Sequence, residues 1–394
     1  MLKRNRTTRR GRSPADEVEL VRLAEGMAAS TSQLEDNFWR RRLLALVDKL
    51  LQDRDEDTLT SALDQLVEGD AEAYTLLADA IESTCESLSL TIDGKPWDAL
   101  LFTAPLLTWS RWQIASGQVS ADTVRNTQTQ LRAHVFARHA LIAIADFLFS
   151  PDQLPRGFVP TLELLQALAQ AAQGSGTLKL DPRTLPETRA FLSDTRYIIG
   201  AVLVPAGEAI FRWQEDDGDQ EEAETQWRRQ GGSVLQPLLP GAASETLLPG
   251  AYHGTWREAD RASRAYALRA TVSFLMLTLN VTARDLQAVI GPFAGKQLEE
   301  YRVGFLRRGD NKVIQGVVWP LLDGEDEHTD CVAEIEAELK DVGIVDIHVH
   351  EHDFPLDYCD DCGSPLYPNP EGEVLHAEPP EEDETQSETP RHLH

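Results

Sequence analysis

The chain has few cysteines and no long apolar run, and each shortage excludes a class of protein. None of its apolar runs reaches the roughly eighteen residues of a membrane-spanning helix, so we expect no membrane span. The N-terminal stretch MLKRNRTTRRGRSP is basic but lacks the apolar segment of a secretory signal. Four cysteines in 394 residues, only two of them close together, do not form a disulfide framework. We therefore expect a cytoplasmic protein.

Basic residues are also scarce, with 37 Lys and Arg against 65 Asp and Glu and a net charge of −28. This balance argues against a general affinity for nucleic acid or anionic membrane, because both repel an acidic surface. Residues 1–14 are the local exception. We expect a disordered basic arm there, or alternatively an arm that contacts RNA, DNA or an acidic partner. Its basic residues are Lys3, Arg4, Arg6, Arg9, Arg10 and Arg12.

No motif of nucleotide binding or nucleophilic catalysis is present. GPFAGK (291–296) lacks the spacing of a phosphate-binding loop, and neither G-x-G-x-x-G nor G-x-S-x-G occurs. The sequence therefore predicts no catalytic residue.

The order of apolar patterns predicts an α/β or α+β fold. Residues 15–95 read as a helical cap, in which Ser32 and Glu35 have the spacing of a capping box. WDALLFTAPLLTW (97–109) is typical of a buried strand, a helix beginning at Ser120 follows, and ALIAIADFLF (140–149) is again apolar.

Residues 96–194 and 195–297 are predicted to be two related αβ lobes, an internal duplication. Both contain Arg-Trp-Gln at similar positions, at 111–113 and 212–214, followed by a polar loop and a helix. We interpret the two segments as structural, with Trp packed between layers; the alternative is a cleft between lobes that binds an anion.

Residues 298–376 predict a hairpin, a helix and a strand. The hairpin spans 299–321, the helix 328–343 ends at Gly343, and the strand is IVDIHVHEH (344–352). A tail at 377–394 is acidic and rich in proline, so we expect it to be disordered. Cys85 and Cys331 fall inside predicted helices, where buried, inert thiols are expected.

Chemistry is concentrated near the C-terminus. In a strand, His348 and His350 would lie on one face together with Asp346 and His352. Cys359-Asp-Asp-Cys362-Gly resembles one knuckle of a zinc ribbon, in which the glycine accepts a positive φ. We expect Asp360 and Asp361 to raise the pKa of the thiols when no ion is bound.

A zinc ion needs ligands beyond this one cysteine pair. His348 and His350 are the preferred candidates, which would give a Cys₂His₂ site with Cys359 and Cys362. His376, Cys331 or another subunit are alternatives. A redox cysteine pair, a hydrolase metal motif in HVHEHD, and a turn that binds nothing are other interpretations of the same residues.

The amino-acid sequence resembles a bacterial family catalogued as domain of unknown function 2863. The segments that carry the resemblance are FWRRRLLALVDKLL, FLFSPDQLPRGF, LPETRAFLSDTRYIIG, FRWQ and YCDDCGSPLYPNPEGE. The resemblance implies a stand-alone bacterial cytoplasmic protein and no known activity.

From the residues we expect a non-enzymatic regulatory or interaction module with one structural zinc and a protein partner or a second copy of itself. A metal-dependent enzyme with the histidine strand at an inter-lobe cleft is the first alternative. An RNA-associated factor acting through the basic arm is the second.

Overall fold

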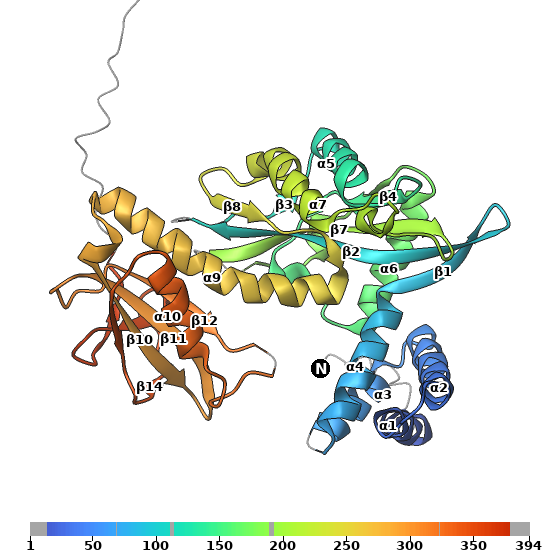
Figure 1. Cartoon of the computed structure of the whole chain (residues 1–394), viewed down its shortest axis with the longest axis horizontal. Coiled ribbons are helices and arrows are strands. Elements are labelled where there is room, and N and C mark those ends of the chain that lie inside the picture. Colours follow the sequence, from blue (N-terminus) through green and yellow to red (C-terminus); the bar gives the residue numbers. More distant parts are fainter. Residues whose placement is uncertain (1–13, 68, 111–113, 189–192, 323, 379–394) are drawn as a thin grey trace, which may run out of the picture.

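The computed structural model describes residues 14–67, 69–110, 114–188, 193–322 and 324–378. These residues form a mixed α/β fold with an N-terminal helical region and two mixed sheets (Figure 1). Within this part of the chain, no helix is both long and apolar enough to cross a membrane.

The N-terminal region is helical, as its apolar periodicity predicts. Its helices are α1 (Pro14–Ala28), α2 (Gln33–Gln52), α3 (Glu56–Val67) and α4 (Ala71–Cys85). Ser32 caps α2, because its Oγ accepts a hydrogen bond from the Glu35 amide at 3.3 Å. The helices end at Cys85, and a hairpin begins at once with β1 (Ser87–Ile92), so the expected helical segment 15–95 extends too far.

The larger sheet follows the order β1-β2-β7-β4-β6, and β8 and β9 also pair with β2. Its long central strands are nearly continuous apolar runs because helices cover both faces. Besides β1, the strands are β2 (Lys95–Trp109), β4 (Leu141–Ala145), β6 (Thr177–Leu178), β7 (Ser193–Pro205), β8 (Ala243–Thr246) and β9 (Gly250–Ala251). A separate small pair joins β3 (Gly117–Gln118) to β5 (Phe147–Leu148).

Two apolar cores lie on the two faces of this sheet. One face packs against the N-terminal helices and α6 (Phe158–Ala172). The other packs against α5 (Ala121–His134), α8 (Gly232–Leu235) and the end of α7 (Gln220–Gln226), where Trp227 is fully buried. The three layers are visible in Figure 1.

The segments 96–194 and 195–297 are not two separate lobes. β7 crosses the boundary between the two segments; it pairs with β2 from Trp97 opposite Pro205 to Trp109 opposite Ser193, and it also pairs with β4. Strands of both segments therefore share one sheet and its two cores. The later part of the second segment leaves that sheet through α9 and enters the other one.

The predicted duplication implies that the two Arg-Trp-Gln segments occupy equivalent places in the fold. The first, 111–113, lies outside the described residues. In the second, Trp213 stacks on Phe211 with ring centroids 4.5 Å apart, and Gln214 Oε1 accepts from the Ile210 and Phe211 amides. These contacts are those of a packed turn.

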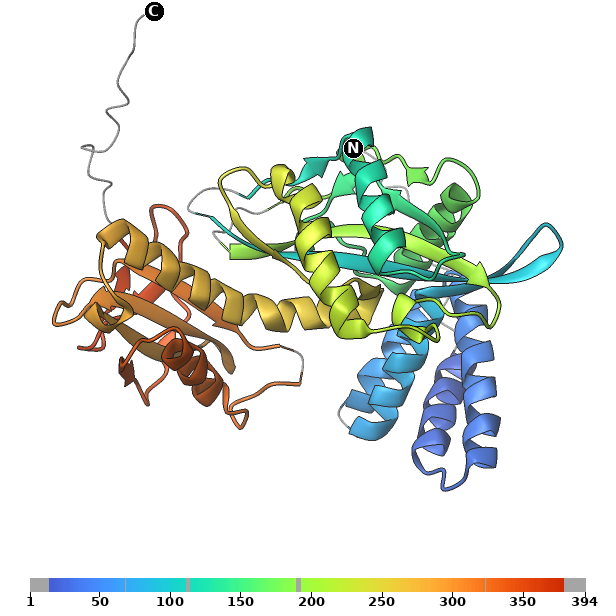
Figure 2. The ribbon, with the colours of Figure 1, turned by 45° about the horizontal axis from the view of Figure 1, so that its top comes forward.

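The C-terminal sheet is reached through α9 (Tyr252–Leu279), which runs from the large sheet to the smaller one (Figure 2). The strand order of the C-terminal sheet is β12-β11-β10-β13, and β14 also pairs with β10. The elements are β10 (Leu286–Ala294), β11 (Leu298–Arg307), β12 (Gln315–Pro320), α10 (Cys331–Asp341), β13 (Asp346–Val349) and β14 (Phe354–Pro355). The predicted hairpin is β11–β12, and Gly343 follows α10 with φ +94°.

The two faces of the C-terminal sheet have different covers. α9 and α10 bury one face with a large apolar core. A short hairpin of β15 (Leu366–Pro368) and β16 (Val374–His376) covers part of the other, with Tyr367 buried beside Val289 and Leu306. This hairpin brings the C-x-x-C segment onto the sheet.

Candidate metal centre

The C-x-x-C segment forms a tight loop, the metal loop (residues 358–365). An isolated β-bridge joins Tyr358 to Pro365 at its base. The Cys359 amide donates to the Ser364 carbonyl at 2.8 Å, and the Gly363 amide donates to the Cys359 carbonyl at 2.8 Å. Gly363 has φ +70°, which confirms the prediction that this turn needs glycine.

A third donor comes from the hairpin that follows the loop. In the β15–β16 pairing, Leu366 lies opposite His376, so the return strand ends beside the cysteines. Sγ of Cys359, Sγ of Cys362 and a ring nitrogen of His376 all lie within 4.8 Å of one another. Cys359 is half-buried, whereas Cys362 and His376 are exposed. Two thiols and one imidazole in this arrangement can hold a metal ion.

The thiol of Cys362 is set up to ionise. Its Sγ lies 3.2 Å from Ser364 Oγ and 3.2 Å from His376 Nε2. Hydrogen bonds from Ser364, then from His376, lower the pKa of Cys362 to about 6. Such hydrogen bonds stabilise the thiolate relative to the thiol. The thiolate is the form that binds metal.

The family described as "Protein of unknown function (DUF2863)" matches residues 5–390. The chain belongs to this family. Searches for similar curated proteins and for similar solved structures both find no match. Membership in DUF2863 confirms the resemblance seen in the sequence and assigns no activity.

His348 and His350 are not among the donors that the structure groups with the cysteines. β13 pairs in parallel with β10, placing His348 opposite Val289, and the His350 amide donates to the Ile290 carbonyl. The imidazole of His350 has Nε2 2.8 Å from the Asn369 carbonyl, at the turn between β15 and β16. The cysteines lie at the other end of that hairpin. The described residues therefore bring His376, one of the alternatives, to Cys359 and Cys362, and the Cys₂His₂ set with His348 and His350 stays a prediction.

The three histidines do share one face, as the alternation predicts. Ring centroids of His348 and His350 are 4.5 Å apart, and those of His350 and His352 are 5.1 Å apart. His352 also lies against Phe354 at 4.4 Å. Burial lowers the pKa of His350. Among the described residues, this row does not form a cluster of three metal donors.

The sequence contains a pattern that favours His376 over His348 and His350 as the neighbour of the cysteines. The stretch LYPNPEGEVLH has two short apolar pieces around a Pro- and Gly-containing turn, which is typical of a hairpin. Such a hairpin brings its last residue back beside its first, which follows closely after Cys362 in the chain.

The other two cysteines are buried in different environments. Cys331 is packed in the C-terminal core, where burial raises its pKa to about 11. Cys85, at the end of α4, has Sγ 3.3 Å from Nε2 of His253 at the start of α9. Burial raises the pKa of Cys85 and lowers that of His253 to about 4. Both thiols are buried, as the sequence predicts.

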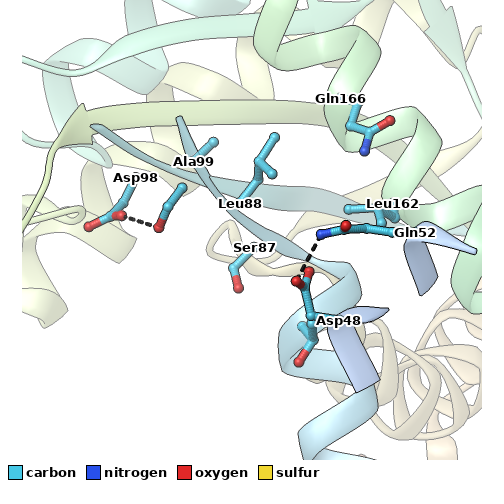
Figure 3. A pocket seen from close by; sticks show the side chains of 10 residues that line it. Asp48, Gln52, Ser87, Leu88, Asp98, Ala99, Leu162 and Gln166 are labelled. Atoms are coloured by element: carbon cyan, nitrogen blue, oxygen red, sulfur yellow. Dashed lines mark hydrogen bonds between the residues drawn. The ribbon is translucent and has the colours of Figure 1, made fainter. Parts of the chain in front are cut away.

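A cavity of about 500 Å³ lies between the helical region and the large sheet (Figure 3). Gln52 Nε2 donates to Asp48 Oδ2 at 2.8 Å on α2, and Ser89 Oγ donates to Asp98 Oδ1 at 2.9 Å across the β1–β2 hairpin. The remaining lining is Thr84, Ser87, Leu88, Ala99, Leu162 and Gln166. This lining offers carboxylates, amides and hydroxyls and includes no Lys or Arg, so it suits a neutral or cationic molecule better than an anion.

Proposed function

We propose that this protein is a non-enzymatic metal-binding regulatory or interaction protein that takes one zinc ion at Cys359, Cys362 and His376. The main support for the proposal is that the ligand atoms of these three residues lie within 4.8 Å of one another at the metal loop. Two sulfurs with one imidazole nitrogen favour zinc over the hard cations Mg²⁺ and Ca²⁺. A cytoplasmic location and a protein partner or second copy belong to the same proposal.

The number of donors supports an interaction role. Zinc in proteins takes four ligands, and the part of the chain that the structure describes groups three here. The fourth position would fall to water or to a donor from another segment or molecule. Because Cys362 and His376 are exposed, such a donor can approach from solution.

Metal content tests the proposal and distinguishes this site from the Cys₂His₂ site with His348 and His350. We expect about one zinc per chain in wild type by inductively coupled plasma mass spectrometry. Cys359→Ser/Cys362→Ser and His376→Gln should lose it. The matched control is His348→Gln/His350→Gln, which should keep it. If His348→Gln/His350→Gln loses zinc and His376→Gln keeps it, the ligands are His348 and His350. Absence of zinc from wild type would refute the proposal.

A metal-dependent enzyme is the second candidate, because three protein ligands with an open position is also the composition of catalytic zinc sites. It predicts that zinc-dependent hydrolysis of some substrate accompanies metal loading and is lost in His376→Gln. The RNA-associated role of the basic arm falls on residues outside the described part of the chain. It stays a prediction, tested by salt-sensitive RNA binding that disappears when residues 1–12 are deleted.

A further inference from the structure

A buried arginine lies directly beneath the metal loop. Arg302, on β11, has a fully buried side chain. Its Nε donates to Glu300 Oε1 at 2.6 Å, which balances the charge. The guanidinium carbon lies 4.2 Å from the centroid of the Phe293 ring and 4.9 Å from that of Tyr358, so aromatic rings cover it. A guanidinium is costly to bury, so its position is held by these partners.

Arg302 connects the two ends of the metal loop. Its Nη1 donates to the carbonyl of Asp357 at 2.6 Å and to the carbonyl of Leu366 at 2.9 Å. These two residues flank the loop immediately before Tyr358 and after Pro365. One nitrogen on a strand of the sheet therefore holds together the two ends of the loop that carries Cys359 and Cys362.

The hairpin after the loop is positioned by close packing against two glycines of the sheet. Gly304 and Gly316 lie opposite each other on β11 and β12. A Cβ at Gly316 would come within 2.3 Å of the Tyr367 ring, and one at Gly304 within 2.5 Å of the Pro368 carbonyl oxygen. The missing side chains thus make room for β15. These contacts place His376, through its pairing with Leu366, beside the closed loop.

The buried turn of the hairpin is satisfied by its own side chain. Asn369 is fully buried, and its Oδ1 accepts from the amides of Glu371 and Glu373 at 3.0 and 2.9 Å. Its Nδ2 donates to Glu373 Oε2 at 3.0 Å. The turn therefore holds its shape by hydrogen bonds within the chain.

We propose that Arg302 is the positioning residue of the metal site: it holds the loop in its liganding shape before the ion arrives, so the ion enters and leaves a preformed site. This inference rests on the proposed function. Small zinc modules commonly fold only when the ion binds, because little else closes their loops. Here Arg302 and the glycine-lined seat close the loop, so zinc occupancy can follow the available zinc without unfolding this part of the molecule. A reversible, metal-responsive site is the result.

Hydrogen exchange on wild type tests the preformed loop without any mutation. Amide exchange of residues 357–368 is measured in metal-stripped protein and after addition of zinc(II). We expect the amides of Cys359 and Gly363 to be protected in both states, with at most a few-fold change. Exchange of this segment at the rate of an unstructured chain without zinc, and protection only with zinc, would overturn the inference while leaving zinc binding intact.

Arg302→Lys tests the positioning role, since lysine keeps the charge near Glu300 but cannot reproduce the planar, bridging donor geometry. Zinc affinity is measured by competition with a chromogenic chelator, and cobalt(II) spectra report thiolate ligation. We expect about a 10- to 100-fold loss of affinity, with thiolate-to-cobalt absorption retained at saturating metal. Arg308→Lys is the matched control: Arg308 follows the same strand, pairs with Asp346 and is exposed.

The outcomes separate the two proposals. Failure of wild type to bind zinc or cobalt defeats the proposed function, and the inference with it. Zinc binding by wild type with equal affinity in Arg302→Lys defeats the inference alone. If Arg302→Lys does not fold by circular dichroism, the exchange experiment on wild type decides.

Discussion

Two cysteine–histidine contacts in this protein have nearly the same length and opposite surroundings. Cys85 Sγ lies 3.3 Å from His253 Nε2, and Cys362 Sγ lies 3.2 Å from His376 Nε2. The first pair is buried between α4 and α9; the second is exposed at the surface. Burial raises the pKa of Cys85 and lowers that of His253, whereas local donors lower the pKa of Cys362 to about 6.

Contact distance alone does not define a reactive site. A buried thiol next to a neutral imidazole is an uncharged pair that packs two helices together. An exposed thiol with a second sulfur nearby can lose its proton to solvent and bind a cation.

Thiol labelling should show the largest difference. In metal-free native protein at pH 7, iodoacetamide should modify Cys362 at least about a hundredfold faster than Cys85, because labelling of a buried thiol has to wait for an opening of the structure. Peptide mass spectrometry over time measures both rates. Equal rates would mean that α4 and α9 separate readily and that the burial argument is wrong.

Removal of each histidine should affect stability very differently. His253→Ala should lower the free energy of unfolding by about 2–4 kcal/mol, since it leaves a cavity beside Cys85. His376→Ala should change it by less than about 0.5 kcal/mol in metal-free protein, as expected of an exposed side chain. Urea denaturation measures both. A large loss in His376→Ala would show that the hairpin depends on this residue for its fold.

The buried pair should also make stability depend on pH. The pKa of His253 is lowered from 6.5 to about 4 by burial, so the unfolded state binds more protons between these values and stability is lost as pH falls through that window. Glu86, whose carboxylate accepts the His253 amide, has its pKa raised to about 7 by burial, and its contribution is lost as pH rises from 4.5 to 7.

The two effects oppose each other in wild type, so variants are needed to separate them. His253→Gln should remove the acid-side loss, and the stability difference between wild type and this variant should shrink by about 2–3 kcal/mol from pH 7 to pH 4. Urea melts across this range measure it. A difference that stays constant with pH would show that His253 does not titrate in this window.

Ser364→Ala should give the smallest effect. Loss of the hydroxyl 3.2 Å from Cys362 should weaken zinc binding about two- to fivefold, the size of one modest hydrogen bond. Chelator competition measures the affinity. Ser87→Ala, near Cys85, is the control and should leave it unchanged. An unchanged affinity in Ser364→Ala would assign the low thiol pKa to the other donors.

Local patterns predicted the elements well because their causes are local. Ser32 and Ser120 cap helices whose apolar spacing is visible in the sequence, and Gly363 has the positive φ that its turn needs. Long-range pairing was harder. Nothing in the segment after residue 195 shows that β7 inserts between β2 and β4, so the division into two lobes failed.

The helices, the β11–β12 hairpin and the cysteine turn follow from the sequence alone, because each depends on residues close in the chain. Which histidine lies beside the cysteines depends on how distant segments pack. His348 and His350 are held by β10 at the far end of the β15–β16 hairpin, while the register of Leu366 opposite His376 brings a single histidine to the loop. Strand register and the burial of Arg302 follow from packing between distant segments, which spacing in one sequence does not encode.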